Sequence, residues 1–200
     1  MRLVGLISGS GTTLQNLIDR TRDGRLAATL AGVVSSRGDV VGVERARAAG
    51  IPVRVVERIP SETFSDRVFA AVRSFSPDLV CLAGWLHLIR IPADFRLRVL
   101  NIHPSLLPAF GGKGMYGRRV HEAVLNYGAK VSGCTVHFAD DTYDTGPVVV
   151  QTAVPVLDED TPETLAARVF AAECEAYPEA IRRVGEGRVT VVGRRVTLRG

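Results

Sequence analysis

Short apolar runs alternate with helical patterns along the first half of the chain. The runs typical of buried strands are residues 3–7, 30–34, 53–56, 78–83 and 99–102. The stretches with apolar side chains at helical spacing are residues 12–22, 40–49 and 61–75. Thr12 or Thr13 is expected to cap the first helix, and Ser61 is expected to open the third. This order predicts an α/β fold with a single open, mostly parallel, twisted sheet and helices on both faces.

The pattern changes in the second half of the chain. Residues 116–127 have helical spacing, whereas residues 130–138 alternate with period two and residues 147–154 form a further strand pattern. Because only a loop separates these two strands, at least one of them is expected to run antiparallel to the rest. Thr161 and Pro162 mark the start of a helix that extends to about residue 184. Residues 189–192 and 195–198 predict a terminal hairpin.

Composition narrows the classes of protein that this chain could be. With 200 residues, 46% of them apolar, the chain is long enough for one domain with a sizeable core. No apolar run approaches the ~20 residues of a membrane span. Cys81, Cys134 and Cys174 are too widely spaced for a zinc motif, and free thiols favour a cytoplasmic location. The net charge of +4 comes from scattered Arg residues, so we expect no nucleic acid partner and no membrane partner.

The segment Ser8-Gly9-Ser10-Gly11-Thr12-Thr13 connects the first expected strand to the first helix. Glycines there allow a tight turn, and the free N–H groups of the helix N-terminus favour an anion. A dinucleotide loop is disfavoured, because Leu14 occupies the place of the third glycine and no acid follows the second strand. A single phosphate monoester therefore fits best, although a simple strand-to-helix turn is the structural alternative.

Asn101 and His103 lie two residues apart at the end of the fifth expected strand. Alternation along a strand places both side chains on one face. An Asn can donate to a developing oxyanion and a His can move a proton, so the pair suggests catalysis rather than packing. Since ligands bind at the carboxyl ends of parallel strands, the segments of residues 8–13, 83–89 and 101–107 are expected to converge on one cleft.

The loop of residues 140–147 contains Asp140, Asp141 and Asp144. Three carboxylates can hold a metal, but their spacing is not that of an EF-hand, and we expect no metal site. A carboxylate next to His103 would favour the imidazolium and raise the pKa of that ring.

Together these segments resemble the folate-dependent glycinamide ribonucleotide (phosphoribosylglycinamide) formyltransferases of purine biosynthesis. The resemblance extends from Ser8-Gly9 to Tyr177-Pro178, and its most specific stretches are Asn101–Pro108 and Asp144–Pro147. It implies the Rossmann-like formyltransferase fold in one domain, in which residues 1–100 hold the ribonucleotide phosphate and residues 101–200 carry catalysis and folate binding. It also implies 10-formyltetrahydrofolate as co-substrate, no metal, and a monomer or homodimer.

The resemblance assigns a role to each matching residue. Asn101, His103 and Asp144 correspond to the catalytic residues. Gly11, Thr12 and Thr13 correspond to the phosphate loop, and Glu173 corresponds to an acid that binds ribose hydroxyls. The residues that correspond to the folate site are Leu86, His87, Leu88, Ile89, Asn101, Asp140 and Asp141. The implied reaction is transfer of the formyl group to the amine of the ribonucleotide.

Some positions depart from the pattern of the family. Glu62 stands where Arg is frequent, which puts a folate contact there in doubt, and Cys174 stands where His is common. The segment of residues 110–116 is longer and richer in glycine than usual, as a mobile cover would be.

Two alternatives remain. One is a related formyl-folate enzyme, either a deformylase-like hydrolase or a tRNA formyltransferase, each of which would be expected to need a further domain. The other is a non-catalytic phosphate- or nucleotide-binding module, which intact catalytic positions argue against.

Overall fold

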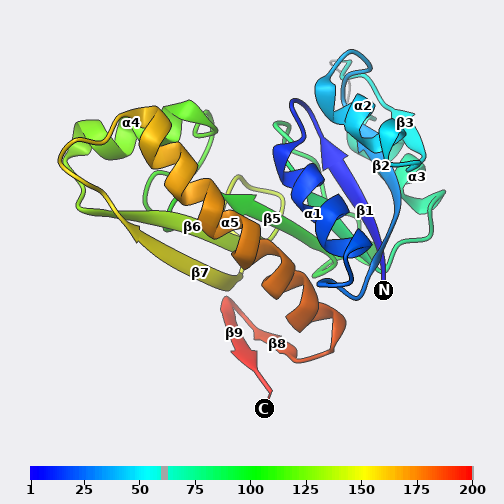
Figure 1. The fold of residues 1–200 in the computed structure, drawn as a ribbon. Coiled ribbons are helices and arrows are strands. Elements are labelled where there is room, and N and C mark those ends of the chain that lie inside the picture. The colour runs from blue at the N-terminus through cyan, green and yellow to red at the C-terminus, as the bar shows by residue number, and fades with distance from the viewer. Residues whose placement is uncertain (60–62, 200) are drawn as a thin grey trace. The chain divides into compact units, whose positions relative to one another are not determined.

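The computed structural model describes residues 1–59 and 63–199 (Figure 1). The chain divides into two compact units, residues 1–101 and 102–200, which are described separately. The expected helix start at Ser61, and with it Glu62, lies outside the described residues.

The first unit is a parallel sheet with helices packed against it. Its strands, in spatial order, are β3 (Val53–Val55), β2 (Thr29–Ser35), β1 (Arg2–Ile7), β4 (Leu79–Leu82) and β5 (Val99–His103), whose last two residues belong to the second unit. Each described pairing among them is parallel. The helices are α1 (Thr12–Arg22), α2 (Val41–Ala48) and α3 (Phe64–Arg73), and a 3-10 turn, η1, covers Ala93–Phe95.

Two glycines show that helices cover both faces of this sheet. A Cβ on Gly5 would contact Leu14 of α1 at 3.2 Å, whereas a Cβ on Gly32 would overlap the ring of Phe75, just after α3. Gly5 pairs with Val33, the neighbour of Gly32, so the two glycines face opposite sides. The expected arrangement of helices is therefore confirmed for this unit.

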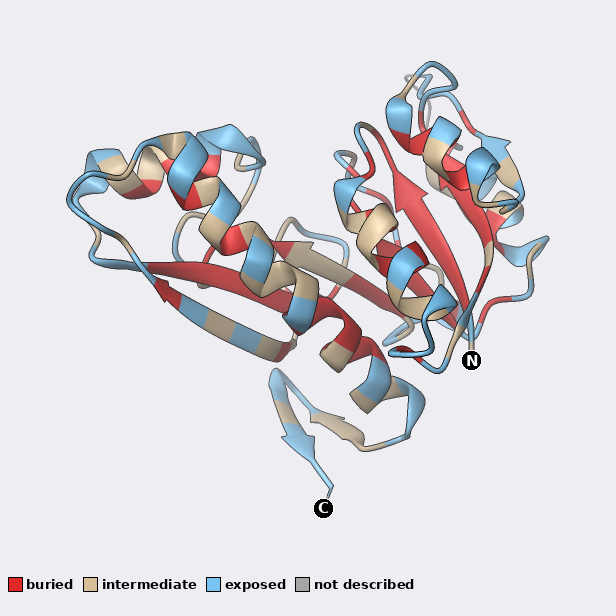
Figure 2. Ribbon diagram, in the orientation of Figure 1, coloured by how far each residue is buried: buried red, intermediate tan, exposed pale blue. Residues whose placement is uncertain are grey.

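The core of the first unit is centred on β1. Leu3, Val4, Leu6 and Ile7 are fully buried, as Figure 2 shows along the length of this strand. A continuous apolar run of this kind is typical of a parallel strand covered on both sides. The run that predicts a strand in the sequence therefore also marks the centre of the sheet.

The second unit combines two antiparallel strands with two helices. Strands β6 (Val131–Phe138) and β7 (Val148–Pro155) pair antiparallel and follow the end of β5 in the sheet order. Helix α4 covers Arg118–Tyr127, and α5 covers Pro162–Gly185. The C-terminal strands β8 (Val189–Val192) and β9 (Arg195–Leu198) form the expected hairpin, a separate sheet. The late antiparallel strand is thus confirmed.

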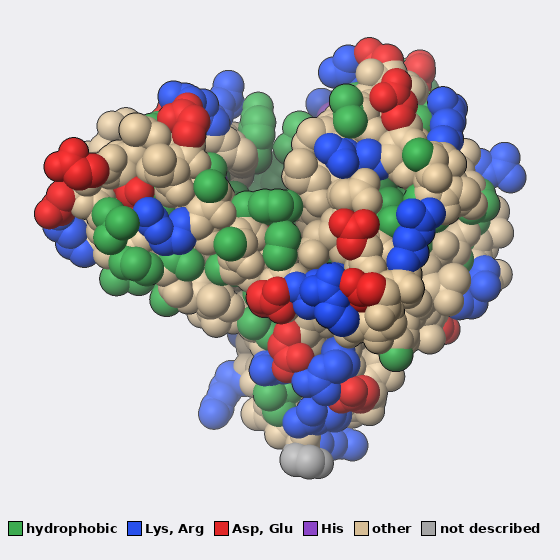
Figure 3. Space-filling view, viewed as in Figure 1, with side chains coloured by type: hydrophobic (Ala, Val, Ile, Leu, Met, Phe, Trp, Pro, Cys, Tyr) green, Lys and Arg blue, Asp and Glu red, His purple; other side chains and the backbone are tan. Residues whose placement is uncertain are grey.

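Helix α5 begins with the cap that its sequence predicts. The side chain of Thr161 accepts from the backbone N–H of Thr164, and the Thr164 hydroxyl accepts in return from the Thr161 backbone. Such a capping box satisfies N–H groups that have no partner within the helix. On the surface, acidic and basic side chains lie next to one another (Figure 3), and Arg182 on α5 pairs with Glu179 and Glu186.

Among the described residues, no helix is both long and apolar enough to span a membrane. The alternation in β6 does not separate a wet face from a dry one, because every residue of this strand after Val131 is buried. Both faces of β6 are covered by other parts of the chain. The polar residues of β6 therefore point into the protein, where they need partners.

Candidate active site

The loop after β1 is held in a conformation that requires glycine. Gly11 has a φ of +68°, and a Cβ there would lie 2.6 Å from the Cα of Gly42 on α2. Gly11 itself is the N-cap of α1, without a side-chain cap, so the expectation that Thr12 or Thr13 caps the helix is wrong. Both threonines instead lie in the first turn of α1, where backbone N–H groups have no acceptor within the helix.

Buried serines connect this loop to neighbouring strands. The hydroxyl of Ser8 accepts from the Ser36 hydroxyl at 2.8 Å and from the backbone N–H of Leu86 at 3.2 Å. The ends of β1, β2 and β4 therefore meet around one side chain. Arg45 on α2 also stabilises the loop, because its Nε donates to the carbonyl of Ser10 at 3.0 Å.

The segment after β4 alternates between anchored and exposed side chains. Trp85 is buried and stacks on Phe64, and the ring of His87 meets both of these rings edge-on. Leu86 and Leu88 are each 44% exposed, whereas Ile89 is buried. The segment is thus fixed by Trp85 and Ile89. Burial, and to a lesser degree the charge of Arg58, lowers the pKa of His87.

Strand β5 carries two of the predicted catalytic residues. Asn101 is half-buried and pairs in register with Leu82 at the end of β4. His103 follows two residues later and is 4% exposed. Their spacing along one strand puts both side chains on the same face, as the sequence predicts.

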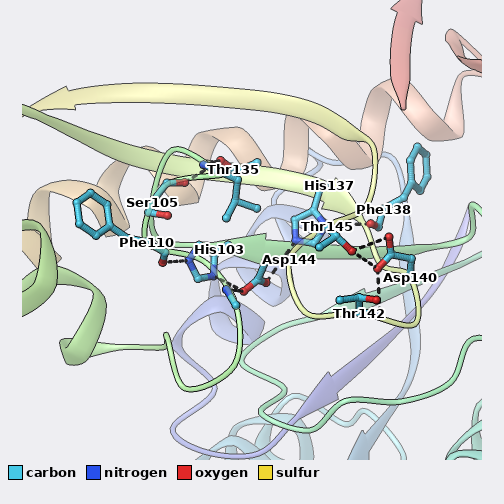
Figure 4. Close-up of polar contacts among 12 residues, drawn as sticks. His103, Ser105, Phe110, Thr135, His137, Phe138, Asp140, Thr142, Asp144 and Thr145 are labelled. Atoms are coloured by element: carbon cyan, nitrogen blue, oxygen red, sulfur yellow. Dashed lines mark hydrogen bonds and ion pairs between the residues drawn. The ribbon is translucent and has the colours of Figure 1, made fainter. Parts of the chain in front are cut away.

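The ring of His103 lies between two oxygen acceptors (Figure 4). Its Nε2 is 2.9 Å from the carbonyl oxygen of Phe110, and its Nδ1 is 3.5 Å from Oδ2 of Asp144. The structure therefore brings His103 and Asp144 together, although they are 41 residues apart in the chain. The same contact fixes which ring nitrogen faces the carboxylate.

The net effect of the environment on His103 differs from the sequence expectation. Burial disfavours the charged ring and lowers its pKa, and this outweighs the contributions of Asp144 and the Phe110 carbonyl, which raise it. The direction expected for the Asp144 contribution is correct, but the expected net rise is wrong. His103 is thus biased toward its neutral form at neutral pH.

Asp144 is held as a carboxylate. Burial acts to raise its pKa, but the contact with His137 and the charge of His103 outweigh this, and the pKa is lowered. The backbone N–H of Gly112 also donates to Oδ2 at 2.8 Å. Asp144 and Phe110 both have positive φ, at 57° and 53°. Both residues that contact the His103 ring therefore adopt a backbone conformation that is uncommon for residues other than glycine.

The sequence interpretation missed His137, which contacts Asp144 from β6. Its Nε2 lies 3.7 Å from Oδ1 of Asp144, and its Nδ1 lies 2.9 Å from the carbonyl oxygen of Phe138. His137 is 2% exposed. The signal that could have identified it is a histidine within a strand pattern that directly precedes the acidic loop.

Thr135, two residues earlier on β6, fixes the turn after His103. Its hydroxyl donates to the carbonyl of Ser105 at 2.7 Å and accepts from the backbone N–H of Leu107 at 3.0 Å. Gln151 on β7 donates to the same hydroxyl and to the Leu107 carbonyl. Strands β6 and β7 thus hold the segment that follows His103.

The acidic loop does not form a metal cluster. Oδ1 of Asp140 accepts from the backbone N–H of Thr142 and from the hydroxyl of Thr145, so this carboxylate stabilises the loop itself. Asp141 is exposed. Within residues 1–59 and 63–199, no group of three or more His, Cys, Asp or Glu side chains is arranged to hold a metal ion.

Glu173 lies on α5, half-buried. Burial raises the pKa of its carboxyl to about 7. Its charge contributes to the pKa of Cys134 on β6, which burial raises to about 12. Glu173 is therefore near Cys134, and its carboxyl is easily protonated, unlike that of Asp144.

Comparison with known proteins places this geometry in a family. The formyl transferase family model matches residues 1–181. The chain is 42% identical over 194 residues to the chloroplastic phosphoribosylglycinamide formyltransferase of Arabidopsis thaliana, covering 94% of this chain and 66% of that protein. It is also 42% identical over 196 residues to the trifunctional purine biosynthetic protein adenosine-3 of Bos taurus, covering 94% of this chain and 19% of that protein.

A solved structure gives the same result for the fold. Glycinamide ribonucleotide transformylase 1 from Symbiobacterium toebii matches with a TM-score of 0.93 and 45% identity, covering 100% of this chain and 94% of that one. The chain spans about two thirds or less of the length of the curated relatives above, but nearly all of this solved structure. It belongs to the formyl transferase family.

Proposed function

We propose that the protein transfers the formyl group of 10-formyltetrahydrofolate to the amine of 5'-phosphoribosylglycinamide, a step of purine biosynthesis. The observation that carries this proposal is the buried contact between His103 and Asp144. His103 lies two residues after Asn101 on β5. The names of similar proteins support the choice of substrates.

The proposed chemistry is acyl transfer through a tetrahedral intermediate. The amine attacks the formyl carbon, and the carbonyl oxygen gains negative charge, which the Asn101 amide and an imidazolium at His103 stabilise. As the carbon–nitrogen bond to the folate breaks, the amine loses a proton and the departing folate nitrogen gains one, with Asp144 assisting this transfer. The products are formylglycinamide ribonucleotide and tetrahydrofolate. Because this is electron-pair chemistry at a carbonyl, we propose no metal and no redox cofactor.

The lowered pKa of His103 fits this scheme if protonation accompanies the reaction. Burial of the ring favours its neutral form. An oxyanion next to the ring adds negative charge and raises its proton affinity as the intermediate forms. Since Nδ1 faces Asp144, Nε2 is the nitrogen proposed to meet substrate, and the substrate oxygen would replace the Phe110 carbonyl there.

We propose that Gly11, Thr12 and Thr13 bind the ribonucleotide phosphate and that Glu173 binds ribose hydroxyls. The positive φ of Gly11 and the free first turn of α1 support the phosphate assignment. We propose that the backbone of residues 86–89 binds the pterin, which agrees with the exposure of Leu86 and Leu88 between anchored neighbours. Asp140 and Asp141 are proposed to contact the same ring from their loop.

The remaining parts of the proposal concern the location of the protein, its oligomeric state, its partners and the roles of its two halves. We propose a cytoplasmic protein, monomeric or homodimeric, whose partners are small molecules rather than nucleic acid or membrane. Residues 1–100 are proposed to hold the phosphate, and residues 101–200 to carry catalysis and further folate contacts.

The test is direct turnover. Protein, phosphoribosylglycinamide and 10-formyltetrahydrofolate are mixed, and conversion of the folate is followed by absorbance. Omitting the ribonucleotide and measuring formate separates a transferase from a deformylase-like hydrolase. His103→Ala should lose most of the rate while its calorimetric affinity for the ribonucleotide stays near that of the native protein. Absence of turnover by native protein, or formate release that needs no ribonucleotide, would overturn the proposal.

A further inference from the structure

Asp144 faces two histidines, not one. His103 and His137 lie on opposite sides of its carboxylate, and the three side chains form a row (Figure 4). We infer that His137 is a positioning residue, which holds the Asp144 carboxylate in the orientation that serves His103. This inference rests on the catalytic roles proposed for His103 and Asp144.

The two imidazole rings are anchored in the same way. Each has one nitrogen 2.9 Å from a backbone carbonyl oxygen, that of Phe110 for His103 and that of Phe138 for His137. Each has its other nitrogen near Asp144, at 3.5 Å from Oδ2 and 3.7 Å from Oδ1 respectively. Each carboxylate oxygen therefore has one ring of its own.

This arrangement restricts where protons can be. A carbonyl oxygen only accepts, so the nitrogen next to each carbonyl must carry a hydrogen. Any further proton is then on Nδ1 of His103 or Nε2 of His137, the two nitrogens that face Asp144. A ring that donates to its carbonyl can therefore donate to Asp144 as well only when both of its nitrogens carry hydrogens. Because both rings face the same carboxylate, a substitution of His137 also changes the surroundings of His103.

The loop that carries Asp144 is tightly fitted against His137. A Cβ on Gly146 would overlap the carbonyl oxygen of Phe138 and lie 3.5 Å from Nδ1 of His137. The backbone N–H of Phe138 also donates to the carbonyl of Pro147 at 2.9 Å. Glycine at position 146 therefore lets the loop approach β6 closely enough for Asp144 to reach the ring.

Other charged groups near the row are few. His121 on α4 is buried, and its pKa is lowered by burial and, to a lesser degree, by the charge of His103, whereas the smaller charge effect that lowers the pKa of His103 comes from His137. The backbone N–H of Gly112 contacts Asp144 from the loop after β5. Asp140 is engaged by Thr142 and Thr145, and Asp141 is exposed. Among these groups, His137 is the titratable side chain that faces the far oxygen of Asp144.

Two substitutions of His137 separate its contact with Asp144 from its contact with Phe138. In His137→Gln, the amide nitrogen reaches roughly the place of Nε2 and can still donate to Asp144. In His137→Asn, the shorter amide can only take the place of Nδ1, so the contact with Phe138 is kept and the contact with Asp144 is lost. We expect kcat to fall about threefold in the Gln variant and about 10- to 100-fold in the Asn variant, with KM nearly unchanged in both.

The pH profile supplies a readout that a merely structural residue would not move. Loss of the donor to Asp144 raises the pKa of that carboxyl, so the acid limb of kcat should move up by roughly one pH unit in His137→Asn and by less in His137→Gln. Ser132→Ala, on the same strand, is the matched control. It removes a buried hydroxyl that has no hydrogen-bond partner among the described residues, and it should leave the profile in place.

A second measurement does not depend on turnover. The chain has four histidines, so the ring resonances of His103 can be assigned by NMR and titrated. With the carboxylate held in place, His103 should titrate at higher pH in the Gln variant than in the Asn variant, by roughly half a unit or more. This holds whether or not the native protein transfers formyl groups.

The outcomes that overturn the inference are distinct. Equal kcat and equal His103 titration in folded Gln and Asn variants would show that the contact with Asp144 does not matter. If the Asn variant fails to fold, a folded Gln variant whose kcat falls more than about 30-fold would overturn it alone. Absence of turnover by the native protein, with the expected order of His103 titrations, would contradict only the proposed function.

Discussion

The loop of the first unit that we propose to bind phosphate and the His103 site of the second unit use different parts of the polypeptide. The loop at residues 8–13 presents backbone N–H groups, and its essential feature is the positive φ of Gly11. The second site presents ionisable side chains, and its essential feature is the row of His103, Asp144 and His137. The first region depends on backbone conformation, and the second depends on the charges of side chains.

The difference has a physical basis. Backbone N–H groups at a helix start do not titrate, so such a site binds an anion at any pH where the anion is charged. Side chains such as Asp144 and His103 change charge with their surroundings, which suits them to proton transfer. Substitutions should therefore affect mainly KM in the first region and mainly kcat or pH dependence in the second.

The largest effect is expected for Asp144→Asn. The amide keeps the size of the side chain and can still accept from Gly112, but the charge next to the two rings is lost. We expect kcat to fall about 10³-fold, because charge stabilisation and proton transfer are both impaired. Ribonucleotide affinity, measured by calorimetry, should change less than threefold. A kcat within tenfold of the native value would contradict the distinction between the regions.

Glu173 tests whether every carboxyl in the second unit behaves like Asp144. Its pKa is raised to about 7 by burial, so the folded state prefers the protonated form. Below about pH 4.5 it is protonated in both states. As pH rises to 7 the unfolded chain ionises first, and stability is lost, by at most about 3 kcal/mol. Relative to Glu173→Gln, the native protein should therefore become less stable between pH 5 and pH 8 in urea unfolding. If the difference in unfolding free energy between the native protein and Glu173→Gln does not change with pH, the pKa of Glu173 is not raised.

Gly11→Ala perturbs the backbone site alone. The new Cβ would meet Gly42 and force an unfavourable φ, so we expect KM for the ribonucleotide to rise about 30-fold with kcat changed less than threefold. Gly24→Ala is the control. It has a similar φ of +78° but nothing within 4 Å of the added Cβ, so it should lower stability slightly and leave KM unchanged. A large fall in kcat for Gly11→Ala would mean that the loop also takes part in the chemistry.

The smallest effect is expected for Arg45→Lys. Arg45 donates to the Ser10 carbonyl and to Gln15, which a lysine cannot do with the same geometry. We expect KM for the ribonucleotide to rise about threefold without a change in the pH profile. A shift of the profile would indicate that charge, rather than loop shape, is what Arg45 contributes.

Local sequence patterns predict the strands and helices well, because the interactions that form these elements involve residues close together in the chain. The run at Leu3–Ile7 and the cap at Thr161 are each formed by neighbours in the chain, and both are found as expected. The first helix differs: Thr12 and Thr13 are good capping residues, but close packing of Gly11 on Gly42 places the cap one residue earlier. That contact joins α1 to α2, and no local pattern contains it.

The candidate site was predictable in part for the same reason. Asn101 and His103 share a strand, so spacing alone relates them. Only the family resemblance relates Asp144 to them, because its contact with His103 depends on the packing of a distant loop. His137 follows the ordinary alternation of a strand, and its contact with Asp144 exists only because Gly146 allows the loop to approach. The net pKa of His103 also depends on burial, which no short motif records.

The contacts of Phe110 and Gly112 with the two proposed catalytic residues have a practical consequence for measurement. Lys113 follows directly and is exposed, whereas Cys81 and Cys134 are buried and Cys174 is half-buried. A cysteine introduced at Lys113 would therefore be the most accessible thiol of the chain for a fluorescent label. If substrate displaces the Phe110 carbonyl from His103, the label should report binding as a change in emission before any formyl group is transferred.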